Sequence, residues 1–338
     1  MRGNKPPKKP SKSGEDRLIE RFFRPLAKHP AALGLMDDVA LMTPPAGADL
    51  VLKTDAIIGG VHFFPDDAAD AVAKKALRVN LSDLAAKGAK PAGFLLALAL
   101  PQDIGEDWLA DFARGLGADA DSYGCPLLGG DTDLTPGPVT ISIAAFGFVP
   151  HGAMVRRAGA KAGETVVATG SIGDAALGLL LRREPKRPVF AKLDGKAKAH
   201  LAERYLLPQP RLALASALRE HASAAIDVSD GLVGDLMKLA AVSGVGAQIE
   251  VKRVPFSPAA RMVLAAEPSL TETALTGGDD YEILATVPAE RLASFQAAAK
   301  SAGVELTAIG RIEPSEGVEV LAEDGRPLAL ARTSFSHF

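Results

Sequence analysis

The chain has 338 residues, of which 47% are hydrophobic, and a formal net charge of −3. This length suggests about two domains of ~150 residues, each large enough to bury a core, and the charge gives no general reason to expect nucleic-acid binding. The longest apolar run, residues 94–101, is far shorter than the ~20 residues of a membrane helix. Cys125 is the single cysteine, which excludes a disulfide framework or a cysteine metal site and fits a reducing, cytoplasmic location.

The chain begins with a basic, proline-rich segment, residues 1–13, which predicts a disordered tail. The segment has no apolar stretch, so it is not a secretory signal. Next, we expect a short helix over residues 18–26 and strands over 38–43 and 49–57. Asp67 is a suitable N-cap for a long helix that ends at Gly88.

A fully apolar strand is predicted over residues 92–100, followed by a helix over 108–121. Two further strands are expected at residues 126–128 and 139–149. This order predicts a first domain, residues 14–150, with a mixed sheet that carries helices on one face.

The second half, residues 151–338, is predicted to be another α/β domain. It begins with a strand over 165–170 and a helix that a glycine loop precedes, and a basic, irregular surface segment is expected over 182–200. Helices are then expected near 197–206, 211–221, 231–244 and 288–302, and strands near 223–228, 246–251, 281–287, 306–312 and 317–322. The fold class is therefore α/β (α+β) with two domains.

Aspartates recur in six short tracts at the expected ends of strands and helices. The tracts are LMDDVAL (35–41), LKTDAI (52–57), VNLSDLAAKG (79–88), LGGDTD (128–133), AIDVSDGL (225–232) and TGGDDYEI (276–283). Mg²⁺ prefers oxygen ligands and usually takes one or two carboxylates together with phosphate oxygens. Glycines beside the aspartates let a phosphate approach the backbone closely. The tracts together predict an enzyme that handles phosphates with Mg²⁺.

Each tract alone also has a structural explanation. Asp131 could belong to a hairpin, and Ser229 or Asp230 could cap the helix that follows. Asp83 is harder to explain in this way, because it lies inside a predicted helix, where aspartate has poor propensity. A G-x-x-x-x-G-K-[ST] motif is absent, so a P-loop is excluded. The six histidines lack metal-pair spacing, and for His62 a structural role is the more common outcome.

Taken in order, the tracts resemble those of thiamine-monophosphate kinases, which belong to the aminoimidazole ribonucleotide synthetase-like superfamily. The resemblance runs from residue 14 to residue 338 and implies ATP-dependent phosphorylation of thiamine monophosphate to thiamine diphosphate, by direct in-line transfer of the γ-phosphate. It implies a homodimer in which the N-terminal sheets of two chains join. ATP, thiamine monophosphate and several Mg²⁺ ions are the expected ligands, and neither nucleic acid nor membrane is an expected partner.

The resemblance also implies site residues. Magnesium ligands would be Asp38, Thr54, Asp55, Asp83, Asp131, Asp227 and Asp230, of which Asp83, Asp131 and Asp230 would be the catalytic ones. Contacts with ATP would come from Gly130, Asp131, Arg157 and Ser229, and contacts with thiamine monophosphate from His62, Asp279 and Phe335.

This chain departs from the family pattern at three positions. Met36 stands where the family usually has glycine, Asp279 where it usually has glutamate, and Lys53 where a small hydroxyl residue is common. Two other functions remain open from the sequence. One is another ATP-dependent synthetase of the superfamily, although a selenophosphate synthetase would need a reactive cysteine near its N-terminus. The other is a non-catalytic nucleotide- or metal-binding module.

Overall fold

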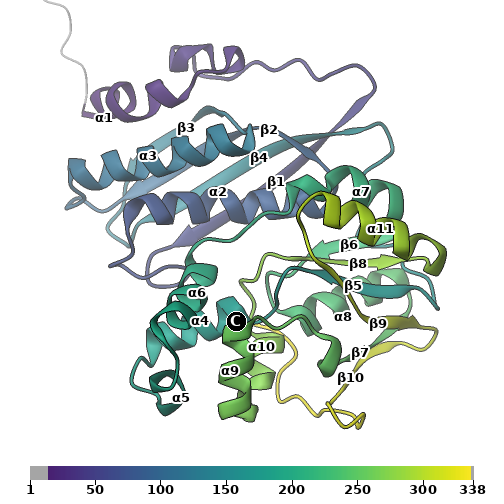
Figure 1. Ribbon diagram of the computed structural model, residues 1–338. Coiled ribbons are helices and arrows are strands. Elements are labelled where there is room, and N and C mark those ends of the chain that lie inside the picture. The colour runs from purple at the N-terminus through teal and green to yellow at the C-terminus, as the bar shows by residue number, and fades with distance from the viewer. Residues whose placement is uncertain (1–13, 336–338) are drawn as a thin grey trace, which may run out of the picture.

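The computed structural model describes residues 14–335, which form two β-sheets that each carry helices (Figure 1). The expected tail over residues 1–13 lies outside the described residues. Within residues 14–335, no helix is both long and apolar enough to cross a bilayer.

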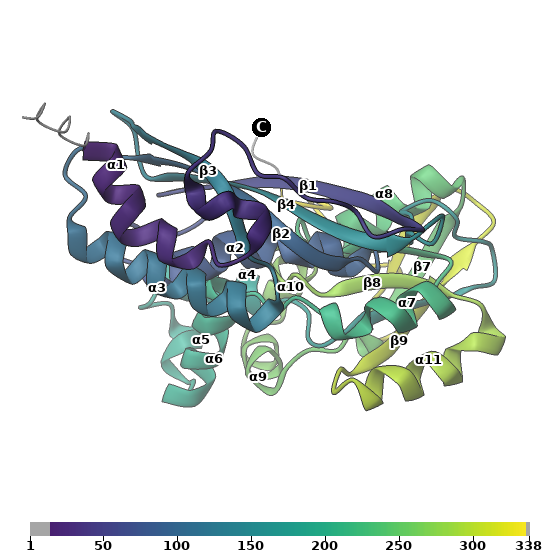
Figure 2. The same cartoon turned by 90° about the horizontal axis from the view of Figure 1, so that it is seen from above.

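The first sheet has four strands in the order β1-β4-β2-β3. Strand β4 pairs antiparallel with β1 and β2, whereas β2 and β3 are parallel, so the sheet is mixed, as predicted. Helices α2 and α3 pack together on one side of it (Figure 2), which confirms the expected helices on one face. The elements are β1 (Ala48–Ile58), α2 (Ala69–Ala86), β2 (Lys90–Leu100), α3 (Glu106–Tyr123), β3 (Leu127–Leu134) and β4 (Thr140–Pro150).

Helix α2 is buried over most of its length, including the polar residues Lys75, Asn80 and Ser82. A helix of this kind must be covered on several sides. One side of α2 contacts β1, β4 and α3, and its C-terminal part contacts β6, β8 and α7 of the second half. This helix therefore joins the two halves of the molecule.

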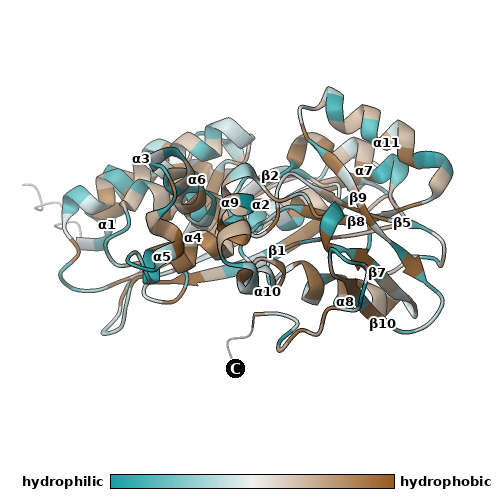
Figure 3. Cartoon of the chain, turned by 60° about the horizontal axis from the view of Figure 1, so that its bottom comes forward, coloured by the Kyte–Doolittle hydropathy of each residue, from teal (hydrophilic) through white to brown (hydrophobic). Residues whose placement is uncertain are grey.

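The second sheet has six strands in the order β10-β7-β9-β5-β8-β6. The strands are β5 (Thr165–Thr169), β6 (Ala224–Asp227), β7 (Gly246–Glu250), β8 (Ile283–Val287), β9 (Leu306–Glu313) and β10 (Gly317–Leu321). The helices are α4 (Asp174–Arg183), α5 (Pro188–Ala191), α6 (Gly195–Leu206), α7 (Ala215–His221), α8 (Leu232–Ser243), α9 (Pro258–Ala266), α10 (Thr271–Thr276) and α11 (Ala289–Ser301). Hydrophobic residues run through the strands, while α1, α3 and α11 carry hydrophilic stretches (Figure 3).

The predicted strand over residues 38–43 is wrong, because the chain is irregular there. One backbone hydrogen bond, from the N–H of Leu41 to the carbonyl of Ala31 (2.9 Å), ties this segment to the preceding turns. Val39 and Leu41 are exposed. Their apolar pattern suggested a strand, but no neighbouring strand pairs with this part of the described chain.

The predicted helix over residues 18–26 begins earlier, with α1 (Gly14–Leu18), and continues through irregular helical turns to Leu26. The long helix α2 ends before Gly88, as expected, and Gly88 has φ +68°. Asp67, however, is not its cap. The carboxylate of Asp67 accepts a hydrogen bond from the N–H of Phe64 (2.8 Å) and pairs with Arg182 (2.7 Å).

The segment 182–200 is not an irregular surface excursion. It contains α5 and the first half of α6, and Val189 and Phe190 are buried in a core cluster that α4, α6 and α9 also supply. The sequence analysis missed these two buried residues because the rest of the segment is highly charged. Helices α9 and α10 were not predicted at all.

Candidate active site

A cleft lies where the C-terminal part of α2 faces the second sheet, and it gathers four of the aspartates that were expected to bind magnesium. Asp55 comes from β1, Asp83 from α2, Asp227 from the end of β6, and Asp230 from the loop before α8. Tracts far apart in sequence therefore meet because α2 docks on the second half of the chain.

Asp227 is the most deeply buried member of this group, with 4% of its surface exposed. The hydroxyl of Ser82, on α2, donates a hydrogen bond to its carboxylate (2.8 Å). Burial and the nearby charge of Asp83 raise the pKa of Asp227 to about 8, although the Ser82 hydrogen bond opposes this rise. Asp227 therefore favours either a proton or a bound cation.

The ammonium of Lys53 lies between two of the carboxylates, 2.8 Å from Asp83 Oδ2 and 3.1 Å from Asp55 Oδ1. Burial lowers the pKa of Lys53, but attraction to Asp83 and Asp55 outweighs burial and the net shift is upward. Lys53 is thus a charged cation inside the acidic group.

Two polar side chains near Asp83 tie α2 to the neighbouring strands. Asn80 accepts a hydrogen bond from the backbone N–H of Asp55 (2.9 Å), and the ammonium of Lys87 donates to the carbonyl of Ala225 on β6 (2.6 Å). Burial lowers the pKa of Lys87, although attraction to Asp227 opposes this effect. These two side chains fix β1 and β6 relative to α2 and so set the spacing of the aspartates.

The loop that carries Ser229 and Asp230 is held by two residues that the sequence did not single out. The carboxylate of Asp235, on α8, accepts hydrogen bonds from the N–H groups of Ser229 (3.0 Å) and Asp230 (2.9 Å). Lys238 pairs with Asp235 (2.8 Å) and with Asp230. Gly231 precedes α8 and no side chain caps that helix, so the capping explanation for Ser229 and Asp230 is wrong. Asp235 lies five residues after Asp230, but its spacing alone carries no signal for this role.

His62, Asp279 and Phe335, the three residues expected to contact thiamine monophosphate, also line this cleft. Ring atom Nδ1 of His62 accepts a hydrogen bond from the backbone N–H of Ile58 (3.0 Å). The N–H of Phe335 donates to the carbonyl of Asp230 (2.9 Å), which brings the C-terminal segment to the cleft.

Asp279 has a buried partner that the sequence analysis missed. Lys75, on α2, is 1% exposed, and its ammonium lies 3.1 Å from Asp279 Oδ2 and 2.9 Å from the carbonyl of His62. The same ammonium lies 3.8 Å from the centre of the Tyr205 ring, and the Tyr205 hydroxyl also donates to the His62 carbonyl (3.0 Å). The position of Lys75 among buried residues of the helix could have revealed this partner, because a lysine is almost never fully buried unless it is paired with an acidic group.

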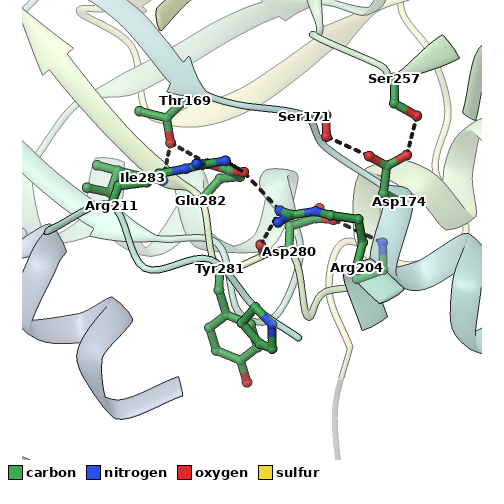
Figure 4. A network of polar contacts seen from close by, with 12 residues as sticks. Thr169, Ser171, Asp174, Arg204, Arg211, Ser257, Asp280, Tyr281, Glu282 and Ile283 are labelled. Carbon is green, nitrogen blue, oxygen red and sulfur yellow. Dashed lines mark hydrogen bonds and ion pairs between the residues drawn. The ribbon is translucent and has the colours of Figure 1, made fainter. Parts of the chain in front are cut away.

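The residues of the tract TGGDDYEI have two different roles: some anchor the tract in the second half of the chain, and Asp279 lines the cleft. Asp280 and Glu282 are buried in a polar network, while Tyr281 points away from it (Figure 4). Asp279 has φ +64° and Tyr281 has φ +51°, backbone conformations that are uncommon outside glycine. The anchoring contacts of Asp280 and Glu282 are with Gly173 N–H (2.8 Å), Thr169 Oγ1 (2.7 Å), Arg204 (2.9 Å) and Arg211. These anchors turn the tract so that Asp279 lines the cleft.

Arg157 and Ser229 also line this cleft, but four of the predicted residues do not. Asp38, Gly130 and Asp131 line a second hollow, on the face of the first sheet that α2 and α3 leave uncovered. Thr54 lies on that face as well, because successive side chains of β1 alternate and Asp55 points the other way.

The oxygen atoms in the cleft suit a hard divalent cation such as Mg²⁺. Within residues 14–335, no three histidine, cysteine, aspartate or glutamate side chains are close enough to hold a metal by themselves. Burial, and then the charge of Asp83, disfavour an ionised Asp227 carboxylate and raise its pKa, so a neighbouring cation would stabilise the ionised form. The donor set therefore fits an ion that takes one or two carboxylates and completes its shell with water or phosphate.

Comparisons with known proteins assign both halves of the chain to the same family. Residues 36–149 match the family described as AIR synthase related protein, N-terminal domain, and residues 161–323 match its C-terminal domain. The thiamine-monophosphate kinase of Caulobacter vibrioides is 40% identical over 323 residues, which cover 94% of this chain and 89% of that protein.

The chain also resembles solved structures of this family. The thiamine-monophosphate kinase of Stenotrophomonas maltophilia K279a has a TM-score of 0.81 and 39% identity, over 93% of this chain and 96% of the other. A structure of AaThiL complexed with AMPPCP and TMP has a TM-score of 0.76 and 32% identity, over 88% and 89% of the two chains.

Proposed function

Since the chain belongs to the thiamine-monophosphate kinases, within the AIR synthase related family, we infer that it transfers the γ-phosphate of ATP to thiamine monophosphate and forms thiamine diphosphate. Apart from the similarity to known kinases, the main structural support for this function is the cleft. It gathers a group of carboxylates from both halves of the chain together with Arg157, His62 and Asp279.

The acceptor of this reaction is itself a phosphate monoester, with a second pKa of ~6 by analogy with phosphoserine. At neutral pH it is already largely a dianion, so the enzyme needs no strong base to create the nucleophile. The work of the site is to hold two polyanions in line and offset their charge. We propose direct in-line transfer without a phosphoenzyme, and analysis of the stereochemistry at the γ-phosphorus tests it: inversion is expected, and retention would contradict it.

We propose that Asp55, Asp83, Asp227 and Asp230 hold Mg²⁺ near the phosphates. Bound Mg²⁺ would neutralise phosphate charge. Asp235 and Lys238 keep Asp230 and its loop in place, and Ser82 orients the carboxylate of Asp227.

Arg157 and Ser229 are the proposed contacts with ATP in the same cleft. Asp38, Thr54, Gly130 and Asp131 keep their proposed roles in magnesium or nucleotide binding. They would act from the uncovered face of the first sheet and not from beside Asp55.

We propose that thiamine monophosphate binds in the same cleft, against His62, Asp279 and Phe335. The buried ion pair between Lys75 and Asp279 fixes the carboxylate, and the contacts of Lys75 and Tyr205 with the His62 carbonyl fix the loop after β1. This part of the cleft is therefore preformed before the substrate arrives, which lowers the entropic cost of binding.

ADP release measured with and without thiamine monophosphate tests the function. We expect release that depends on thiamine monophosphate. Equal release with and without it would favour another ATP-dependent synthetase of the superfamily, and the absence of release together with retained nucleotide binding would favour a non-catalytic module.

We further propose a homodimer that forms through the β1 and β4 part of the uncovered face of the first sheet, at the opposite edge from Gly130 and Asp131 on β3. Leu52 on β1 is 64% exposed there, and Leu50, Phe146 and Phe148 lie around the same hollow. A contiguous apolar face of this kind marks an interaction surface. Leu52→Lys should convert a dimer to a monomer in light scattering, whereas Val242→Lys, at a 54% exposed position on α8, should not. A monomeric parent protein would contradict the proposal.

The remaining expectations are also proposals. We place the domain boundary near residue 150, between the last strand of the first sheet and the first strand of the second. We place the reaction in the cytoplasm, where ATP is available.

A further inference from the structure

We propose that Lys53 takes the place of one divalent cation in the acidic cleft, so that the chain binds nucleotide with one metal ion fewer than a variant with a neutral residue at position 53. This inference rests on the proposed function of the cleft, because it concerns the same phosphates and carboxylates. It assigns to Lys53 a role in charge neutralisation that the aspartates alone do not reveal.

The position of Lys53 follows from strand geometry. Lys53 and Asp55 are two residues apart on β1, so their side chains lie on the same face of the strand. That face is covered by α2, which carries Asp83. The ammonium thus meets both carboxylates, at 2.8 Å from Asp83 Oδ2 and 3.1 Å from Asp55 Oδ1.

The Lys53 ammonium occupies the position that a metal ion bridging Asp55 and Asp83 would need. A divalent cation shared by Asp55 and Asp83 would have to approach the same two oxygen atoms, and a cation is repelled by an ammonium already in contact with them. Lys53 and a bridging metal ion at this pair therefore exclude each other. The Lys53 side chain is still 29% exposed and lines the cleft, so its charge also faces the space where phosphates would lie.

The remaining carboxylates stay available to a metal ion. The Asp227 carboxylate is hydrogen-bonded by Ser82, and the Lys53 ammonium is bonded to Asp55 and Asp83 instead. Asp230 pairs with Lys238, which is itself paired with Asp235. Lys53 thus contacts one oxygen atom each of Asp55 and Asp83, while the other oxygen atoms of these two carboxylates, together with Asp227, remain for a divalent cation.

The number of bound metal ions tests this inference directly. Mn²⁺ binding to the full chain is counted by electron paramagnetic resonance in the presence of a non-hydrolysable ATP analogue and without thiamine monophosphate. Lys53→Thr and Lys53→Met should each bind one more Mn²⁺ per chain than the parent protein. Lys53→Arg, which keeps the charge, should bind the parent number.

A matched control is Lys74→Thr. Lys74 is also a lysine paired with an aspartate, Asp70 (3.2 Å), with a side-chain exposure of 24%, but it lies outside the cleft. Its replacement should leave the count unchanged. Equal counts in the parent protein and both neutral Lys53 variants would overturn the inference.

Circular dichroism with Mn²⁺ present verifies that each variant is folded. Failure of both neutral variants to fold under these conditions would also overturn the inference, because a bound metal ion should then replace the lost ammonium. The count does not depend on turnover. If the proposed kinase function is wrong, ADP release will not depend on thiamine monophosphate. That result is distinguishable from a failure of this inference, which the metal count alone decides.

Discussion

Replacing Asp227 with asparagine should stabilise the metal-free protein at high pH. The pKa of Asp227 is raised from 3.8 to about 8 in the folded chain, chiefly by burial and then by the charge of Asp83. Between these two values the folded chain keeps a proton that the unfolded chain has already lost. The free energy of unfolding therefore falls as pH rises from about 4 to about 8. Asparagine has nearly the same shape, still accepts the Ser82 hydrogen bond and cannot ionise.

The size of this effect follows from the shift. Each pKa unit corresponds to about 1.36 kcal/mol, so a shift of about four units corresponds to about 5 kcal/mol. This value is an upper limit, because water that enters the cleft screens part of the repulsion from Asp83. We expect the stability advantage of Asp227→Asn to be near zero at pH ~4 and to reach several kcal/mol at pH ~9.

Urea denaturation followed by circular dichroism, in EDTA and at several pH values, measures this advantage. Asp70→Asn is the control, because the carboxylate of Asp70 pairs with Lys74 away from the cleft. Its effect should not grow with pH. A difference between Asp227→Asn and the parent protein that stays constant from pH ~4 to ~9 would refute the reasoning about burial and Asp83.

Three further predictions concern turnover and substrate binding. Asp83→Asn should leave the melting temperature nearly unchanged and almost abolish ADP formation, because a neutral amide cannot offset metal charge; an active variant would return Asp83 to a purely structural role. Asp279→Asn should raise KM for thiamine monophosphate about tenfold, as expected for the loss of one charge-assisted hydrogen bond, about 1.4 kcal/mol, and leave KM for ATP unchanged. Steady-state kinetics with each substrate varied in turn checks this, and an equal rise for ATP would exclude Asp279 as a contact of thiamine monophosphate. The pH–rate profile should fall below pH ~6, where the acceptor phosphate is protonated, and His62→Ala should keep that fall while raising KM for thiamine monophosphate; loss of the acidic limb in His62→Ala would make His62 a catalytic base.

Local patterns were sufficient to predict most elements of the fold. Residue periodicity and helix stop signals predicted the strands β2 and β4 and the long helices α2 and α3. These elements could be predicted because the signals that define them lie within a few neighbouring residues. Residues 38–43 show the limit of this approach. Their alternation suits a strand, but a strand also needs a partner, and partners are decided by the rest of the chain. Helix α5 was missed for a similar reason, because its two buried anchors, Val189 and Phe190, are few among many charges.

The sequence by itself determined which residues were chemically suited to phosphate and metal, since the aspartates stand in glycine-rich tracts that can be recognised without coordinates. It could not separate Asp279, which lines the cleft, from its neighbour Asp280, which is buried in a structural network. Only the tertiary structure decided that Asp83 faces Asp227 and that Lys53 lies against Asp83. The physical reason is the docking of α2 between the two sheets: contacts between residues so distant in sequence depend on how whole elements pack, and no local pattern encodes that packing.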